Sequence, residues 1–189
     1  MFSSIITNIN WVDICLAILL LRICYIAVKN GFPQEVFKIF GVIAAVFLSM
    51  HYYLFLSELI RDRLGLGLES TALRSLEFFV FLTLVILSQF FFVILRKIFS
   101  KALKVEVLPT LNKWGGFILG VARGLLLGSL LMFIMLLSGA DFLNKGVKES
   151  YSGKYIVGVA PAVYCSLWQG FLSKLFTGDK LNDSVLEVQ

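Results

Sequence analysis

Four long runs of apolar residues constrain the fold of this chain more than any other feature. Each run approaches the roughly 20 residues that a helix needs to cross a bilayer. They predict spanning helices over residues 11–28, 36–55, 78–95 and 114–137. The runs are continuous and do not alternate between apolar and polar residues, which favours a helical bundle over a strand barrel. We therefore expect an all-α membrane protein with four transmembrane helices.

The composition indicates the same class of protein. Of the 189 residues, 59% are hydrophobic and only 15% are charged, and the mean hydropathy is +0.90. This apolar content lies well above that of soluble domains. We therefore expect the chain to lie in a lipid bilayer. The formal net charge of +5 is interpreted as a sign of membrane topology and gives no reason to expect a nucleic-acid partner.

A fifth apolar stretch, residues 155–176, is amphipathic. Small or polar residues share one helical face of this stretch: Ala162, Ser166, Gln169 and Ser173. Apolar residues share another face: Val163, Leu167, Phe171 and Leu175. This pattern favours an interfacial helix, while a fifth transmembrane helix kinked at Pro161 stays open as the alternative. We expect a four-helix transmembrane domain over residues 1–140, followed by an interfacial helix and a polar tail over residues 141–189.

The distribution of lysine and arginine predicts the orientation in the membrane. Five cations lie between or beside the third and fourth spans: Arg96, Lys97, Lys101, Lys104 and Lys113. Because cytoplasmic loops are rich in such residues, this connection is expected to be cytoplasmic and both termini periplasmic. A fifth spanning helix would move the C-terminus inside. Lys101 and Lys104 could also contact anionic lipid.

Glycines recur at every fourth position in the fourth span, at Gly116, Gly120, Gly124 and Gly128. Residues four apart lie on one face of a helix, and small residues allow two helices to approach closely in lipid. The face is therefore expected to pack against another helix. That helix could belong to this chain, to a second copy in a homo-oligomer or to another membrane protein.

A single arginine, Arg123, lies within the same glycine-rich span. It is about 15 Å along the helix from Lys113, close to the middle of a core roughly 30 Å thick. By this depth count neither Asp13 nor Glu35 lies at its level, and Gln89 is at a comparable depth and could form a hydrogen bond with it. We expect Arg123 to lack an acid of its own chain, so it is a candidate functional residue whose neighbours would indicate the function.

The two acids near helix ends have structural explanations as well. Asp13 is expected to cap or anchor the first helix at the outer interface. Glu35 follows Gly31 and Pro33, which resemble a tight turn entering a helix, and an acid in the first helical turn complements the helix dipole. A functional role for either residue remains a hypothesis.

The chain lacks the common catalytic motifs, including HExxH, GxSxG and the phosphate-binding glycine loop. It has one histidine, His51, and three cysteines, of which Cys15 and Cys24 lie nine positions apart in one predicted helix. That separation excludes a disulfide between them. We expect no enzyme activity, no cofactor and no metal centre.

Three short motifs in register carry a resemblance to a known family. Asn10, Trp11 and Asp13 precede the first span, Gly31, Phe32 and Glu35 form a turn, and Gly116, Gly120, Arg123 and Gly124 lie in the fourth span. Together they resemble the colicin V production protein family over about the first 140 residues. The chain departs from the family pattern at Ala27, where a glycine is common, and at Asn30, where a basic residue is common.

The resemblance implies a bacterial inner-membrane protein needed for production of a secreted peptide toxin or for a related envelope process. It supplies no established catalytic residue. Two functions follow as hypotheses. The chain is either an accessory protein that binds a membrane partner, or a small oligomeric transporter or channel in which Arg123 and Gln89 line a path for an anionic solute.

Overall fold

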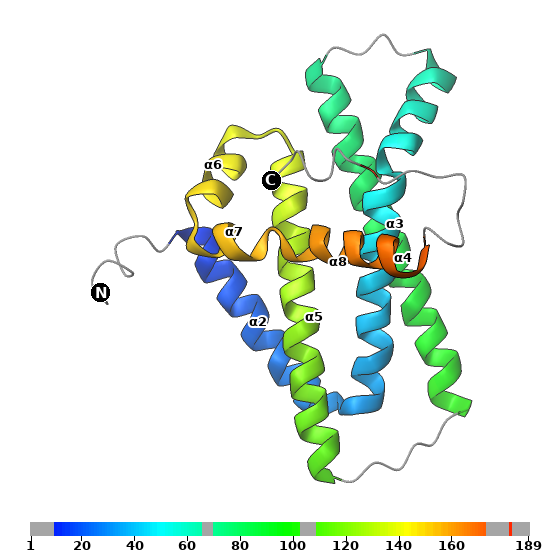
Figure 1. The fold of residues 1–189 in the computed structure, drawn as a ribbon, viewed down its shortest axis with the longest axis vertical. Coiled ribbons are helices and arrows are strands. Elements are labelled where there is room, and N and C mark those ends of the chain that lie inside the picture. Colours follow the sequence, from blue (N-terminus) through cyan, green and yellow to red (C-terminus); the bar gives the residue numbers. More distant parts are fainter. Residues whose placement is uncertain (1–9, 66–69, 103–108, 173–181, 183–189) are drawn as a thin grey trace.

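A computed structural model describes residues 10–65, 70–102, 109–172 and 182 of the chain. Within these ranges every regular element is helical (Figure 1). Four helices are long and apolar enough to cross a membrane. They are α2 (Trp11–Asn30), α3 (Phe32–Leu64), α4 (Ser70–Ala102) and α5 (Pro109–Leu137). The expected all-α fold with four spanning helices is confirmed.

Helices α3 and α4 are much longer than the sequence predicted. Each has 33 residues, or about 50 Å at 1.5 Å per residue, whereas the hydrocarbon core is about 30 Å thick. The predicted range 36–55 covered only the apolar part of α3. The helix continues through charged residues until Gly65, whose left-handed conformation (φ 60°) ends it and whose N–H donates to the carbonyls of Arg61 and Asp62.

The spanning helices pack side by side in the order α2, α5, α3, α4 (Figure 1). Helix α5 packs between α2 and α3, and α4 packs mainly on α3. A tight hairpin at Gly31 (φ 78°) joins α2 to α3. Asn112 of α5 binds this hairpin: its side-chain oxygen accepts a hydrogen bond from the N–H of Phe32 at 2.7 Å.

Away from this hairpin, the space between α3, α4 and α5 is filled by apolar side chains. Twelve buried side chains form one contiguous group. Six of them, each 2% exposed or less and contributed by these three helices, are called the apolar cluster: Val46, Met50, Tyr53, Phe81, Leu130 and Phe133. Phe81 lies at its centre, with ring contacts to Tyr53 and Phe133 at centroid distances of 5.5 and 5.3 Å. Close packing of this kind stabilises helix contacts in lipid, where apolar burial alone gives little.

The C-terminal segment crosses the bundle as a series of short helices (Figure 1). These are α6 (Asp141–Glu149), α7 (Tyr151–Ile156), α8 (Val159–Leu167) and a π-helical turn, Trp168–Leu172. The longest has nine residues, far fewer than a spanning helix requires. Residues 155–172 therefore do not form the fifth transmembrane helix that was left open, and residues 173–176 lie outside the described ranges.

The amphipathic pattern of α8 agrees with its position. Ala162 and Ser166 of α8 and Gln169 of the π-helical turn are exposed, as the predicted polar face requires. Val163 and Leu167 of the predicted apolar face are half-buried. The most buried side chains of this part are Tyr164 and Trp168, which the sequence did not single out. Ser129 of α5 fixes the entry to α8, because its hydroxyl donates to the carbonyl of Val157 at 2.7 Å and accepts from the N–H of Ala160 at 2.8 Å. Ser173 of the predicted polar face and Leu175 of the predicted apolar face lie outside the described residues, as does the side chain of Phe171.

Residues of the C-terminal segment contribute to the same core as the spanning helices. Tyr164 packs with the apolar cluster, and Val147 packs with Leu16 and Met132 at the start of α2. His51 on α3 also contacts this segment, stacking on Trp168 with ring centroids 4.8 Å apart. The division of the chain at residue 140 into two domains stays a prediction.

Candidate functional site

The glycine face of α5 is occupied by α2 of the same chain. A Cβ atom added at Gly116 would lie 2.8 Å from the backbone oxygen of Ala27, and one at Gly124 would lie 2.7 Å from Leu20 Cδ2. Added Cβ atoms at Gly120 and Gly128 would collide with Ala27 and Leu16. Of the three occupants left open by the sequence, the structure therefore places an intramolecular helix on this face.

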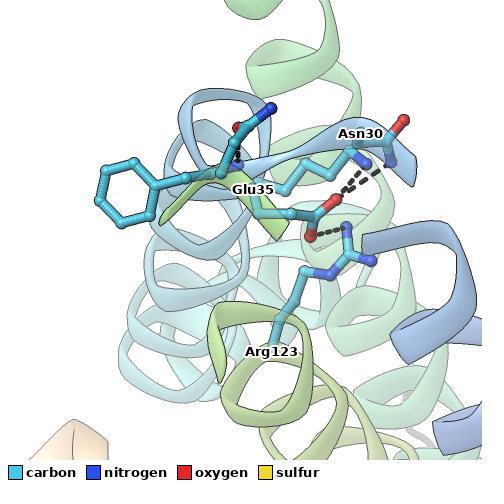
Figure 2. Close-up of polar contacts among 6 residues, drawn as sticks. Asn30, Glu35 and Arg123 are labelled. Atoms are coloured by element: carbon cyan, nitrogen blue, oxygen red, sulfur yellow. Dashed lines mark hydrogen bonds and ion pairs between the residues drawn. The ribbon is translucent and has the colours of Figure 1, made fainter. Parts of the chain in front are cut away.

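This packing brings the α2–α3 hairpin alongside α5 and places Glu35 next to Arg123. The Nη1 atom of Arg123 lies 3.2 Å from Oε2 of Glu35. Figure 2 shows the carboxylate of Glu35 between the side chains of Asn30 and Arg123. Glu35 is fully buried and Arg123 is 9% exposed. A buried ion pair of this kind is costly to leave with only one partner.

The expectation that Arg123 lacks an acid of its own chain is therefore wrong. The depth count placed Glu35 at the membrane surface because it opens α3. In the structure the hairpin at Gly31 lies beside Asn112 and Gly116 of α5, and Glu35 lies one helical turn farther along α3, toward the level of Arg123. A long side chain on a helix also points toward the helix N-terminus, so Arg123 reaches back toward the hairpin.

Glu35 has two further partners on its other oxygen. Oε1 accepts from Nζ of Lys38 at 2.5 Å and from Nδ2 of Asn30 at 3.1 Å. Its place in the first turn of α3 is as expected. The approach of Arg123 to Oε2 is an ion pair that lacks hydrogen-bond alignment, and Nε of Arg123 has no hydrogen-bond partner within the described ranges.

A cavity of about 220 Å³ lies between α3, α4 and α5, on the hairpin side of the apolar cluster. Polar side chains from all three helices line it: Lys38, Gln89, Arg96 and Arg123. Apolar side chains complete its wall: Phe37, Val42, Phe92, Val93 and Leu127. The cavity thus gathers three cations within the membrane-spanning part of the protein.

Gln89 lines this cavity, but it does not form the hydrogen bond with Arg123 that its depth in the membrane suggested. Its amide nitrogen donates to the carbonyl oxygen of Gly41 at 3.3 Å. A Cβ atom at Gly41 would lie 2.9 Å from Cβ of Phe92, so α3 and α4 approach closely here. Gln89 and Arg123 line one cavity without a direct hydrogen bond between them.

Asp13 lies at the opposite end of the bundle and joins α2 to the C-terminal segment. One carboxylate oxygen accepts from the N–H of Asn10 at 3.0 Å, which completes a capping box at the start of α2. The other accepts from the N–H of Ser152 at 2.7 Å and from the Ser152 hydroxyl. The expected capping role is present, and the contact with α7 adds an anchoring role that the sequence did not reveal.

Two residues of the cavity, Lys38 and Arg96, were not singled out from the sequence. Lys38 lies three positions after Glu35, a spacing that places both on one helical face, and this could have indicated their contact. Arg96 was assigned only a topological role. The side chain of Lys101, and all of Lys104, lie outside the described residues, so the lipid contact expected there stays a prediction.

The described residues contain no group of three or more histidine, cysteine, aspartate or glutamate side chains placed to hold a metal ion. Cys15, Cys24 and Cys165 form no disulfide bond with one another. The chemical groups that the candidate site does gather are cationic donors and one carboxylate. Such a set is suited to binding an anion or to holding helices together, and it contains no nucleophile with an adjacent base.

A comparison with known protein families gives one finding. The family model described as colicin V production protein matches residues 12–161. No curated protein and no solved structure matches the chain. The match covers all four spanning helices and ends within α8, so it includes Arg123, Glu35 and the hairpin.

Proposed function

The chain belongs to the colicin V production protein family, and on this premise we propose that it is an accessory protein of the bacterial inner membrane. In this proposal it supports the production or export of a secreted peptide toxin, or a related process of the cell envelope. It has no enzymatic activity of its own. Both termini lie in the periplasm, as the distribution of cations predicts.

One observation carries the accessory role: the bundle is closed by its own packing. The apolar cluster fills the space between α3, α4 and α5 beyond the cavity, and α2 fills the glycine face of α5. A channel function would instead require polar groups along the full length of the bundle. A closed bundle supports a role through contacts on its outer surface.

The outer face of α4 offers a surface for such a contact. Its exposed apolar side chains extend along four turns: Phe79, Ile86, Leu87, Phe90, Phe91 and Ile94. Aromatic side chains provide large contact areas in membrane interfaces as well as in soluble ones. In the proposed function this face binds a membrane-protein partner or a second copy of the chain.

The proposal is tested by toxin secretion from a strain that lacks the gene. We expect export of the peptide toxin, or integrity of the envelope, to fall in that strain and to be restored by the wild-type gene. A variant with Phe90 and Phe91 replaced by alanine is expected to insert normally and to fail to restore it. Full restoration by this variant would exclude the α4 face, and a deletion strain with normal export and envelope would contradict the function.

A small transporter for an anionic solute remains a second candidate, because Arg123 and Gln89 line one cavity together with two more cations. Transport would require the apolar cluster to open in each cycle. Solute flux from purified protein in liposomes, abolished in R123Q, would favour this function over the accessory role. Absence of flux together with a stable complex with one partner would favour the accessory role.

A further inference from the structure

We propose that the cavity between α3, α4 and α5 is a binding site for a phosphate-bearing anion. The site is formed by Lys38, Arg96 and Arg123, and Gln89 offers an amide beside them. This inference goes beyond the proposed function and does not depend on it. Nothing in the family description assigns a ligand to these residues.

The charge of the site calls for an anion. Three cations line the cavity, and a single carboxylate, that of Glu35, is shared by Lys38 and Arg123. No acid within the described ranges forms an ion pair with Arg96. Together, Lys38, Arg96, Arg123 and Glu35 therefore have a net charge of +2. Cations held close together away from bulk water repel one another, and a bound anion would offset that repulsion.

Arg123 supplies an independent reason to expect a ligand. Its side chain is 11% exposed and lines the cavity, yet its Nε–H has no hydrogen-bond partner among the described residues. A buried donor without a partner loses free energy, and a donor on a charged group loses more. Guanidinium groups match the oxygen geometry of phosphate, and two of the three cations are arginines.

The size and position of the cavity fit such a group. Its volume of about 220 Å³ far exceeds the roughly 10–15 Å³ that one water requires. Val93, which is 40% exposed, lines it, so the cavity reaches the outer surface of the bundle. Phe90 and Ile94 are exposed on the adjoining turns of α4 and offer an apolar surface on which acyl chains could lie.

Two sources share this chemistry, the phosphate of an anionic phospholipid and a free phosphate compound. Basic pockets between spanning helices are a known type of site for anionic headgroups on the cytoplasmic side of membranes. The predicted topology places this end of the bundle on that side. The shared requirement is a phosphate group that contacts Arg96 and Arg123, and the experiment separates the two sources.

The test uses the full chain purified in a nonionic detergent that has been depleted of lipid. The midpoint of thermal unfolding is measured in inorganic phosphate and compared with its value in chloride at equal ionic strength. It is also measured with added phosphatidylglycerol and compared with its value with added phosphatidylcholine. The informative variant is R96Q, because Arg96 lines the cavity without contacting Glu35. The matched control is K113Q, since Lys113 is an exposed cation at the same end of the bundle.

We expect phosphatidylglycerol, inorganic phosphate or both to stabilise the wild type and K113Q, with binding about ten-fold weaker in R96Q. Stabilisation by the lipid alone identifies a headgroup, stabilisation by inorganic phosphate alone identifies a free phosphate compound, and stabilisation by both identifies a phosphate site that accepts either source. Equal stabilisation of wild type and R96Q would overturn the site, as would the absence of any stabilisation by either ligand. These outcomes are independent of toxin export.

Discussion

Arg123 on α5 and Glu35 at the start of α3 form a buried ion pair, with Nη1 and Oε2 3.2 Å apart. The pair links the first turn of one spanning helix to the middle of another, and it depends on the close contact between α2 and α5 at Gly116 and Gly120. Two features that seemed separate in the sequence, the glycine series and the lone arginine, thus belong to one arrangement.

Removal of the acid from this pair is expected to destabilise the protein. In E35Q the guanidinium of Arg123 stays buried without its counter-ion. Removing one partner of a buried ion pair lowers the free energy of unfolding by about 3–5 kcal/mol. Thermal unfolding in detergent and abundance in membranes both measure the loss. The control is K145Q, because the pair of Lys145 and Glu149 is 74% and 60% exposed and contributes less than about 1 kcal/mol. Equal stability of E35Q and K145Q would contradict the role of the pair.

The contact between Gly120 and Ala27 allows a test by exchange. G120A is expected to destabilise the bundle by about 1–3 kcal/mol, since the added methyl group collides with the methyl group of Ala27. The double variant A27G/G120A moves the methyl group from one helix to the other and is expected to recover most of that loss, because one glycine and one alanine remain in the two helices and their helix propensities offset each other.

The control for this exchange is G170A, because a Cβ atom at Gly170 would meet nothing within 4 Å. Its stability is expected to stay within about 0.5 kcal/mol of wild type. The midpoint of thermal unfolding is compared across all three variants. If A27G/G120A is no more stable than G120A alone, the two helices do not meet at these residues.

Asp13 is expected to hold α7 against the start of α2. D13A removes the acceptor for the N–H and hydroxyl of Ser152 and for the N–H of Asn10, and hydrogen bonds to a charged group contribute about 1.5–3 kcal/mol. Amide hydrogen exchange in α6 and α7 should therefore become faster. D141A is the control, since Asp141 is an exposed acid in the first turn of α6. Unchanged exchange in D13A would show that α7 is held by other contacts.

Ser129 is expected to determine how α8 meets α5. S129A leaves the carbonyl of Val157 and the N–H of Ala160 without their buried partner, a loss of about 1–3 kcal/mol. The matched control is S166A, because the exposed hydroxyl of Ser166 bonds only within its own helix, to Ala162. Proteolysis near residues 157–160 compares the two variants, and equal protection in both would exclude this role of Ser129.

The sequence predicts the parts of this fold that depend on local pattern. The four spans are set by apolar length, and the cap at Asp13 and the acid in the first turn of α3 follow from residue types at helix starts. The exposed face of α8 follows from its 3.6-residue period. Each of these properties can be determined within one helix.

The arrangement around Arg123 could not be predicted in the same way, because it depends on which helices are neighbours and on how far side chains reach along the bundle. A depth count compares only the levels of the backbone. The hairpin at Gly31 lies alongside Asn112 and Gly116 of α5. Glu35 lies one helical turn farther in, and the long side chain of Arg123 reaches back toward it. The cavity that Arg96 lines forms only where α4 packs against α3 and α5. No residue pattern within a single helix indicates such a cavity.

The central claim, that the glycine face of α5 holds α2 of the same chain, is tested most directly by cysteine crosslinking in native membranes. Cysteines are placed at Ala27 and Gly120 in a chain whose Cys15, Cys24 and Cys165 have been replaced. We predict that A27C/G120C forms a disulfide within one chain on oxidation, after a small separation of the helices, and that G120C alone stays monomeric. A disulfide-linked dimer from G120C alone, or no bond within A27C/G120C, would contradict the account.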